Sequence, residues 1–390
     1  MARVTVIGHD GGGFSSQALA AIASAKLVVG GARHLSDVDT GVETIVLGPI
    51  APAIERIAAH DGDVVVLASG DPGFFGIVRA LRAAGISLTV LPSVSSLAAA
   101  FARAGLPWDD AIVVSAHGRE LRRAVNVCRA HPKVAVLTAP GSGPAELGAA
   151  LAGVPRTFVV AERLGTPDER ISTVENPSGD WADPNVVIVL DPARAGTIGP
   201  RWVAGAGLGP AGWALPESTY AHRDSMITKA EVRAYVLARL GPRLGDLVWD
   251  IGSGSGSVAV ECASFGAAVI AVDRDPQAIP LIEQNSAGLG MQIVQGAAPQ
   301  CLHALPDPDA VFVGGGGLET LSACAARRPS RLVTALAAVD RVGPALAILE
   351  SAGYESEGVA LQASRLSALP DGSHRLAAVN PVFVLSGVLP

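Results

Sequence analysis

The sequence has few aromatic residues, few charged residues and no excess of positive charge. Aromatic residues make up 4% of its 390 residues and charged residues 17%, and acids outnumber bases by 36 to 29, giving a net charge of -7. This balance argues against binding of nucleic acid through bulk charge. No apolar run reaches the roughly 18 residues that a membrane span needs, and no charged-then-apolar leader precedes the first expected strand. We therefore expect a cytoplasmic protein that contacts no membrane.

The cysteines form no pattern typical of a disulfide framework or a metal site. Cys128, Cys262, Cys301 and Cys324 include no C-x-x-C pair and have no histidine at ligand spacing. We expect them to be small buried apolar side chains in a reducing compartment. The sequence therefore predicts no metal site.

Short β-branched segments alternate with Ala- and Leu-rich segments of helical period along most of the chain. This alternation is typical of α/β folds, and the length suggests about two domains. Residues 192–222 break the pattern, because Pro and Gly are too dense there for either period. We expect a domain of residues 1–195, a Pro/Gly-rich linker of residues 196–216 and a second domain of residues 217–390. A helix opened by Thr228 should precede the second series of strands.

Two series of strands are expected from the apolar segments. The first comprises the segments that begin at residues 3, 63, 87, 111, 133, 157 and 185. The second comprises those that begin at residues 247, 268, 291, 310, 331 and 380. The two series show no internal repeat, so neither half of the chain is a copy of the other.

A strand that runs into a glycine-rich turn and a helix is expected at residues 248–261, VWDIGSGSGSVAVE. The G-x-G-x-G spacing of this turn differs from the G-x-G-x-x-G of a dinucleotide fingerprint. The next strand ends in Asp273, whose carboxylate can accept hydrogen bonds from both ribose hydroxyls of a nucleoside. Such glycines can also form only a tight turn, but the strand, the turn and Asp273 together favour a site for S-adenosylmethionine (SAM). The predicted cofactor-binding residues of the turn are Gly252, Ser253, Gly254, Ser255 and Gly256.

The segments MITKAEVRA, WDIGSGSGSVAVE, AVDRDPQAIPLIEQN, LPDPDAVFVGGGG and NPVFVLSG occur in this order in the second half of the chain. Through them residues 217–387 resemble the CbiT family, SAM-dependent C15-methyltransferases and decarboxylases of cobalamin biosynthesis. The resemblance implies a Rossmann-like class I SAM-dependent methyltransferase fold, with Thr228 and Ala298 in contact with SAM. Ala297 stands where that family has an aspartate near the adenine. We expect the missing hydrogen bond to weaken SAM binding by about 0.5 to 1.5 kcal/mol.

The segments VVGGARHL, LASGDPGFFGI, LPSVSSLAAAFARAGLPWDDAIVVSAHGRE and AERLGTPDER occur in the first half. Through them residues 3–191 resemble the CbiE family of tetrapyrrole methylases, in which SAM lies folded between two α/β subdomains. The resemblance implies this fold, and it places cofactor contacts in three turns. These contacts are Gly8 and Asp10, Gly70 and Asp71, and Ser93, Ser95 and Ser96. Each turn also has a structural reading, because Asp-Pro-Gly is a favoured β-turn and the serines can cap the following helix.

A fusion of the two families in this order resembles the CobL family of precorrin-6Y C5,15-methyltransferases (decarboxylating). The resemblance implies SAM-dependent methylation of a precorrin at carbons 5 and 15, with loss of carbon dioxide from the ring C acetate. We expect a tetrapyrrole substrate, no nucleic acid partner and a homo-oligomer. Arg119 follows a strand end, where it can receive a substrate carboxylate. No catalytic residue is predicted, because positioning a methyl group against an electron-rich meso carbon can supply most of the rate.

Two other functions stay open at the level of sequence. The chief alternative is an RNA methyltransferase, because similar folds occur in enzymes that act on RNA. The low aromatic content and the net negative charge disfavour it. A non-catalytic scaffold of two decayed domains is supported only by Ala297, because the glycines of the turn and Asp273 are intact.

Overall fold

The computed structural model describes residues 3–39, 41–196, 203–205, 209–223 and 226–390. The chain forms two compact units that alternate along the sequence. Unit 1 comprises residues 1–119, 133–190 and 200–205, and unit 2 comprises residues 120–132, 191–199 and 206–390.

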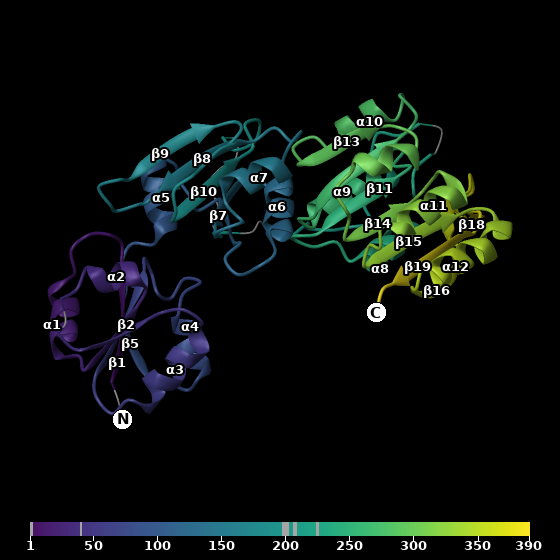
Figure 1. The fold of residues 1–390 in the computed structure, drawn as a ribbon. Helices are drawn as coiled ribbons and strands as arrows, with labels where there is room; N and C mark the ends of the chain where they lie inside the picture. Colours follow the sequence, from purple (N-terminus) through teal and green to yellow (C-terminus); the bar gives the residue numbers. More distant parts are fainter. Residues whose placement is uncertain (1–2, 40, 197–202, 206–208, 224–225) are drawn as a thin grey trace. The chain divides into compact units, whose positions relative to one another are not determined.

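The first part of unit 1 is a parallel five-stranded sheet flanked by helices (Figure 1). Its strands, in the order β3-β2-β4-β1-β5, are β1 (Val4–His9), β2 (Leu27–Gly30), β3 (Glu43–Val46), β4 (Val64–Ser69) and β5 (Leu88–Leu91). Its helices are α1 (Ser16–Ser24), α2 (Ala32–Ser36), α3 (Ile50–Ala59) and α4 (Val78–Ala83). Neighbouring residues of β1, such as Val6 and Ile7, enter two separate apolar clusters, because successive side chains of a strand point to opposite faces. The parallel order brings the carboxyl ends of β1 and β4 to the same edge.

The second part of unit 1 is a mixed five-stranded sheet. Its strands, in the order β6-β7-β10-β8-β9, are β6 (Ile112–Ser115), β7 (Lys133–Leu137), β8 (Thr157–Glu162), β9 (Arg170–Val174) and β10 (Asn185–Leu190). Only β6 and β7 pair in parallel. The helices are α5 (Ser96–Ala104), which packs on the sheet through Leu97 and Phe101, and α7 (Pro144–Ala150).

Helix α6 (Leu121–Ala130) connects β6 to β7 in sequence but belongs to unit 2. Its polar residues bind the loops at the amino ends of two strands of that unit. Arg123 donates to Asp246 at 2.8 Å, and Asn126 donates to the Gly245 carbonyl at 3.0 Å and to Asp309 at 3.3 Å. Asp246 and Asp309 are both buried, and α6 supplies part of the donors that they need, beside Arg331 for Asp246 and the Leu247 N–H for Asp309.

Unit 2 is built on a seven-stranded sheet in the order β13-β12-β11-β14-β15-β19-β16 (Figure 1). Its strands are β11 (Leu247–Ile251), β12 (Ala268–Asp273), β13 (Met291–Gln295), β14 (Ala310–Val313), β15 (Arg331–Leu336), β16 (Glu355–Leu361) and β19 (Val382–Val388). Its further helices are α8 (Ala230–Leu240), α9 (Ser257–Ser264), α10 (Ile279–Asn285), α11 (Gly317–Ala326) and α12 (Val342–Ser351), with short 3-10 helices η1 (Glu217–Thr219), η2 (Gln300–Ala304) and η3 (Val339–Arg341). The first five strands in the order are parallel, and β19 is antiparallel to both of its neighbours.

Helices cover both faces of this sheet. Val248 packs with residues of α8, α9 and α10, whereas Trp249 packs with residues of α11 and α12. The strand order reverses at β11, which lies between β12 and β14. Open α/β sheets bind ligands in the crevice at such a reversal, at the carboxyl ends of the strands.

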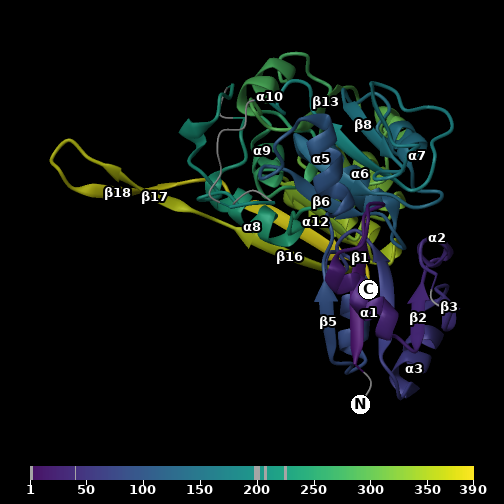
Figure 2. The ribbon, with the colours of Figure 1, turned by 90° about the vertical axis from the view of Figure 1, so that its left-hand side faces the viewer.

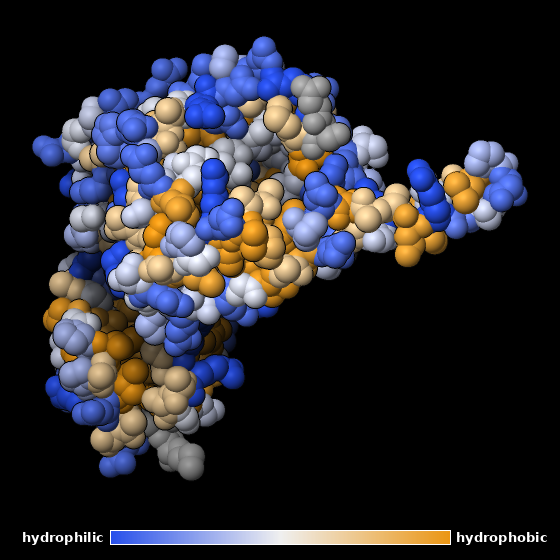
Figure 3. Space-filling view, turned by 90° about the vertical axis from the view of Figure 1, so that its right-hand side faces the viewer, coloured by the Kyte–Doolittle hydropathy of each residue, from blue (hydrophilic) through white to orange (hydrophobic). Residues whose placement is uncertain are grey.

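A hairpin of β17 (Ser364–Ala368) and β18 (His374–Ala378) projects from the seven-stranded sheet between β16 and β19 (Figure 2). Leu366 and Leu376 face each other across it and are 72% and 68% exposed. Figure 3 shows hydrophobic and hydrophilic surface side by side on the projecting hairpin. None of the described helices is both long and apolar enough to cross a membrane. None of the four cysteines forms a disulfide, and all but the half-buried Cys301 are buried.

The α/β fold class predicted from the sequence is confirmed, and every expected strand is present. The sequence analysis missed β2, β3, β9, β16 and the two strands of the hairpin described above. β3, β9 and β16 lie at sheet edges and are partly exposed, so their sequences carry no continuous apolar signal, whereas β2 is buried but only four residues long. The expectation that Thr228 opens a helix is wrong, since α8 begins at Ala230 with Lys229 as its N-cap. The described residues between β10 and η1 contain no helix or strand, as expected for the linker; residues 197–202 and 206–208 lie outside the described ranges.

Candidate functional site

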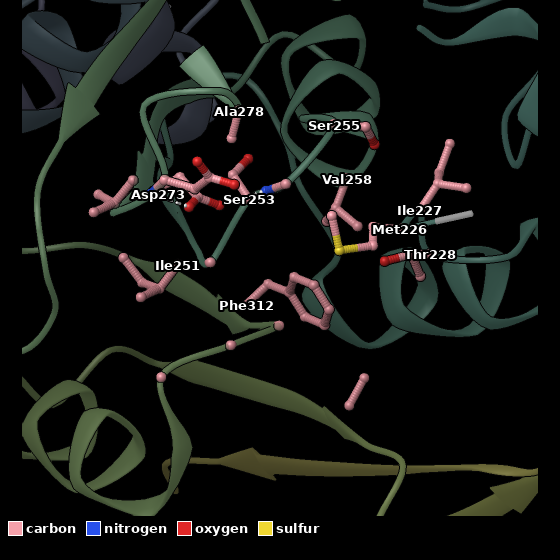
Figure 4. A pocket seen from close by; sticks show the side chains of 18 of the residues that line it. Met226, Ile227, Thr228, Ile251, Ser253, Ser255, Val258, Asp273, Ala278 and Phe312 are labelled. Atoms are coloured by element: carbon pink, nitrogen blue, oxygen red, sulfur yellow. Dashed lines mark hydrogen bonds between the residues drawn. The ribbon is translucent and has the colours of Figure 1, made fainter. Parts of the chain in front are cut away.

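A cavity of about 910 Å³ lies at the carboxyl ends of β11, β12 and β14 in unit 2 (Figure 4). The sequence-predicted residues that line it are Thr228, Gly252, Ser253, Gly254, Ser255, Asp273 and Ala298. Ala297 also lines it. In Figure 4, Asp273 and Ser253 lie on one side and Met226, Ile227 and Thr228 on the other. The structure therefore brings together residues that the sequence separates by up to 70 positions.

The glycines of the turn after β11 serve different purposes. Gly252 has a φ of 71°, and a Cβ there would lie 2.6 Å from the backbone nitrogen of Gly315. Only glycine therefore allows the two loops at this edge to touch. Gly256 does not line the cavity, contrary to what a cofactor contact would require. It is the N-cap of α9, and a Cβ there would lie 3.2 Å from Ile282 of α10, so its role here is helix packing.

The Asp273 carboxylate organises the turn and still faces the cavity. Its Oδ2 accepts from the backbone N–H of Gly254 at 2.7 Å, and its Oδ1 accepts from the backbone N–H of Asp275 at 2.9 Å. A carboxylate has about four lone-pair positions, so two acceptor positions are left for a ligand. This arrangement suits a group that presents two hydroxyls, as the sequence analysis expected of a ribose.

Asp250 is fully buried beneath the turn, at the carboxyl end of β11. Its Oδ2 accepts from the Ser253 hydroxyl at 2.7 Å and from the Ala259 N–H at 3.0 Å, while Oδ1 has no hydrogen-bond partner. Burial raises the pKa of Asp250 to about 6, and the nearby Asp273 charge adds to the rise. The folded protein therefore holds a proton here more tightly than the unfolded chain does.

We predict that Asp250→Asn removes a pH-dependent destabilisation. Because the folded-state pKa of Asp250, about 6, lies above the ordinary value of 3.8, the free energy of unfolding should fall as pH rises between these values. The difference between these two pKa values corresponds to about 3 kcal/mol of unfolding free energy. The natural protein should lose this amount as the pH rises, whereas the variant should not. Denaturant unfolding at pH 4, 5, 6 and 7 should show the variant gaining on the natural protein across this range. A constant difference at all four pH values would contradict the prediction.

The opposite wall of the cavity is held by a buried ion pair that sequence reasoning missed. Arg233 of α8 donates to Glu261 of α9 at 2.6 Å and to the Thr228 carbonyl at 2.6 Å. Tyr220 also donates to Glu261, at 2.8 Å, and burial together with this carboxylate raises the pKa of Tyr220. Arg233 stands in an amphipathic helix where it could equally face solvent, so no sequence signal distinguished it. The pair fixes the backbone at Thr228, where the cavity wall begins.

Apolar side chains and glycines complete this cavity. Phe312 at the end of β14, Val258 of α9 and Met226 line it, as do three glycines of the run at 314–317. Since Gly314, Gly315 and Gly316 lie on the cavity wall, the run adds no side-chain bulk there.

A second cavity, of about 830 Å³, lies within unit 1. The sequence-predicted residues that line it are Asp10, Gly70, Asp71, Ser95, Ser96 and Arg119. Gly8 and Ser93 are not among the lining residues. A Cβ at Gly8 would lie 2.2 Å from the Gly70 carbonyl oxygen and 2.7 Å from the Ser93 nitrogen. Gly8 therefore allows the three predicted turns to pack together.

The polar side chains of these turns bind one another and the local backbone. The Asp10 carboxylate accepts from the Gly12 N–H at 3.0 Å, and a hydrogen bond from Ser93 is the main cause that lowers the pKa of Asp10. Asp71 accepts from the Gly73 N–H at 2.8 Å, which closes the Asp-Pro-Gly turn. The Ser95 hydroxyl accepts from the Ala98 N–H at 3.1 Å and caps α5, so the structural reading of this serine is confirmed. A cofactor contact by these residues stays a prediction.

Two exposed aromatic rings stand at the second cavity. Phe74 and Phe75 are 41% and 43% exposed and line it, with ring centroids 4.9 Å apart. Phe75 has a φ of 54°, an unusual conformation for a side chain of this size. The Arg119 guanidinium lies 5.9 Å from the Phe75 ring centroid. Arg122 and Arg123, in contrast, pair with Asp309 and Asp246, while their side chains stay 39% and 52% exposed.

Two family models match the chain. Residues 9–177 match the tetrapyrrole (corrin/porphyrin) methylases, and residues 218–369 match the precorrin methyltransferase domain. A precorrin-6Y C(5,15)-methyltransferase (decarboxylating) from Sinorhizobium sp is 37% identical over 329 residues, 80% of this chain and 78% of that protein. The chain belongs to this family. The resemblance stated from the sequence is confirmed, and precorrin-6Y C(5,15)-methyltransferases are enzymes, which removes the scaffold alternative.

Relatives about half as long as this member of the precorrin-6Y C(5,15)-methyltransferase family also match it. A probable cobalt-precorrin-6B C(15)-methyltransferase (decarboxylating) from Pyrobaculum calidifontis is 32% identical over 185 residues, 44% of this chain and 94% of that protein. A cobalt-precorrin-7 C(5)-methyltransferase from Salmonella typhimurium is 34% identical over 203 residues, 48% of this chain and 98% of that protein. All three relatives are named for a precorrin, and nothing in these matches points to the RNA alternative.

Proposed function

We propose that this chain methylates a precorrin at carbons 5 and 15 and removes carbon dioxide from the ring C acetate, using one SAM site in each half. The observation that carries the proposal is the presence of two separate cavities, one in each compact unit, each lined by turns that the sequence predicts to bind SAM. A single-site enzyme would need only one of them.

The chemistry is divided between the halves. We assign methylation of carbon 15 and decarboxylation to the cavity of unit 2, and methylation of carbon 5 to the cavity of unit 1. The half-length relatives support this division, because one is named for each activity. The domain boundaries that accompany it are residues 1–195, a linker of residues 196–216, and residues 217–390.

The residues of the unit 2 cavity fit SAM. Glycines stand where a Cβ would meet backbone, Asp273 keeps acceptor positions for two hydroxyls, and Phe312 supplies an apolar wall. A volume of about 910 Å³ lies within the range of small-molecule sites. We expect Asp273 to hold the ribose, the turn residues Gly252–Ser255 to lie against the amino acid end, and Ala298 to contact the adenine. When bound, SAM supplies an electrophilic methyl group on a sulfonium.

The chain contributes binding, orientation and exclusion of water. Met226, Val258 and Phe312 give the first cavity apolar walls in which a carbon nucleophile can approach without water. In the second cavity, the exposed faces of Phe74 and Phe75 suit a flat conjugated ring, and Arg119 beside them suits one of its carboxylate arms. Orientation of this kind can supply a large part of the rate without a side chain that attacks the substrate.

Two alanine variants of the full chain test the division. Gly252→Ala places a Cβ 2.6 Å from Gly315, and Gly8→Ala places one 2.2 Å from Gly70, so each should disable one cavity. We expect Gly8→Ala to add one methyl group and release carbon dioxide, and we expect a mixture of the two variants to add both methyl groups. Mass spectrometry of a precorrin incubated with SAM measures both results.

The matched control is Gly343→Ala in α12, where an added Cβ meets nothing within 4 Å. This variant should behave as the natural chain. If both variants fold by circular dichroism but their mixture fails to add the second methyl group, each activity depends on both halves of one molecule and the division is wrong.

A further inference from the structure

Two histidines and an aspartate meet on the wall of the second cavity. His9 is the last residue of β1, His34 lies in α2, and Asp37 directly follows α2. All three line the cavity, and one potential ligand atom from each lies within 4.8 Å of the others. Both histidines are buried, whereas Asp37 is exposed. The fold thus gathers three side chains of types that can bind a metal ion at one sheet edge.

The hydrogen bonds of His34 leave one ring nitrogen unused. Its Nε2 lies 2.8 Å from the Ser69 hydroxyl, while its buried Nδ1 has no hydrogen-bond partner. With the proton on Nε2, that nitrogen donates to Ser69 and Nδ1 keeps a free lone pair. A buried acceptor without a donor is costly unless something else satisfies it.

His9 and Asp37 form no hydrogen bond with each other. His9 Nδ1 and Asp37 Oδ2 are 3.8 Å apart, beyond hydrogen-bond distance. The ligand atoms of a tetrahedral zinc site are separated by about 3.4 Å, given metal–ligand bonds of about 2.1 Å. The ligand atoms of His9, His34 and Asp37 all lie within 4.8 Å of one another, so the three side chains must move closer together to hold an ion.

We propose that His9, His34 and Asp37 bind one divalent transition-metal ion of the zinc type, with its remaining coordination position open to the second cavity. Two imidazoles and a carboxylate are a common ligand set for such ions. Ser69 takes the role of the outer partner that fixes the ring orientation of a ligand histidine. The open position can take water or a carboxylate oxygen of a bound molecule. The proposal concerns the metal site alone and does not rest on the proposed function.

This site escaped the sequence analysis, which searched for cysteines and for histidines at ligand spacing. His9 is separated from the other two ligands by 25 residues and more, and no pattern links them. Only the parallel pairing of β1, β4 and β2 brings the end of β1 beside α2.

Metal titration of the full chain tests the proposal. The purified protein, stripped with a chelator, is dialysed against Zn²⁺ and the bound metal is counted by mass spectrometry. Co²⁺ is then added, and its visible absorption reports the ligand geometry. We expect one Zn²⁺ per chain, loss of binding by at least tenfold in His34→Asn and Asp37→Asn, and a loss of about 10- to 100-fold in Ser69→Ala.

His60→Asn is the matched control, because His60 bonds only to its own loop at Gly62 and does not line the cavity. It should bind Zn²⁺ as the natural chain does. Since Asp37 is exposed, Asp37→Asn keeps the test valid if a buried histidine variant misfolds. Equal Zn²⁺ affinity of the natural chain and Asp37→Asn, or no stoichiometric binding at micromolar Zn²⁺, would overturn the proposal.

Discussion

Asp273→Ala should weaken SAM binding at the unit 2 cavity by about 10- to 150-fold, which corresponds to the 1.5 to 3 kcal/mol of hydrogen bonds to a charged group. The expected loss has two sources. The ribose loses its acceptor, and the N–H groups of Gly254 and Asp275 lose the carboxylate that orients the turn. Methylation at carbon 15 and release of carbon dioxide should fall with the affinity.

Calorimetry of the full chain with SAM measures this effect, because the unit 1 cavity serves as an internal reference. The variant should bind one SAM with its normal affinity and the other with an affinity about 10- to 150-fold lower. Asp371→Ala, at the tip of the projecting hairpin, is the control for removal of a carboxylate elsewhere and should change neither event. Two undiminished binding events in Asp273→Ala would show that the ribose is held by other residues.

Glu261→Gln should lower the free energy of unfolding by about 3 to 5 kcal/mol, the usual cost of removing one partner from a buried ion pair. Arg233 is fully buried and would keep only carbonyl partners and the Tyr220 ring, 4.8 Å from its guanidinium carbon. Glu261 also accepts from the backbone N–H groups of Ala214 and Leu215. A glutamine cannot accept from all of these donors, since one of its two terminal atoms is itself a donor.

Denaturant unfolding measures the loss, and Glu357→Gln is the matched control. Glu357 pairs with Arg239 at 2.8 Å, but both are largely exposed, so this change should have little effect. Because Arg233 also holds the Thr228 carbonyl, Glu261→Gln should weaken SAM binding in unit 2 even where the variant is still folded. A loss of stability no larger than that of the control would mean that water reaches the pair.

The sequence predicted the central strands of unit 2 and most lining residues of the unit 2 cavity, and for the same reason, whereas it missed the buried four-residue strand β2 of unit 1. Strands such as β11 are buried on both faces, so they are continuous apolar runs, and the glycine turn follows directly in sequence. Asp273 could be placed because it ends the neighbouring parallel strand. Edge strands such as β16 alternate only weakly between buried and exposed residues, and their sequences contain no continuous apolar run.

The features that sequence reasoning missed all depend on pairs of residues far apart in the chain. Arg233 and Glu261 are an ordinary basic and an ordinary acidic helix residue until α8 and α9 pack together. His9 and His34 become neighbours only through the pairing of strands between them. The role of Ser95, in contrast, could be predicted from local sequence, because a serine three residues before a helical N–H indicates a helix cap. The structure contains this cap.

Helix α6 imposes an order in time on the assembly of the chain. It is synthesised early, but its partner Asp309 follows Asn126 by 183 residues. At roughly 5 to 20 residues per second, the ribosome needs roughly 10 to 40 s to make that stretch. Until then Asn126 cannot donate to Asp309, and its other partner in unit 2, the Gly245 carbonyl, also follows it by 119 residues. Unit 1 can complete its sheets during this interval. Unit 2, in contrast, must fold around a helix that was synthesised long before most of its other residues.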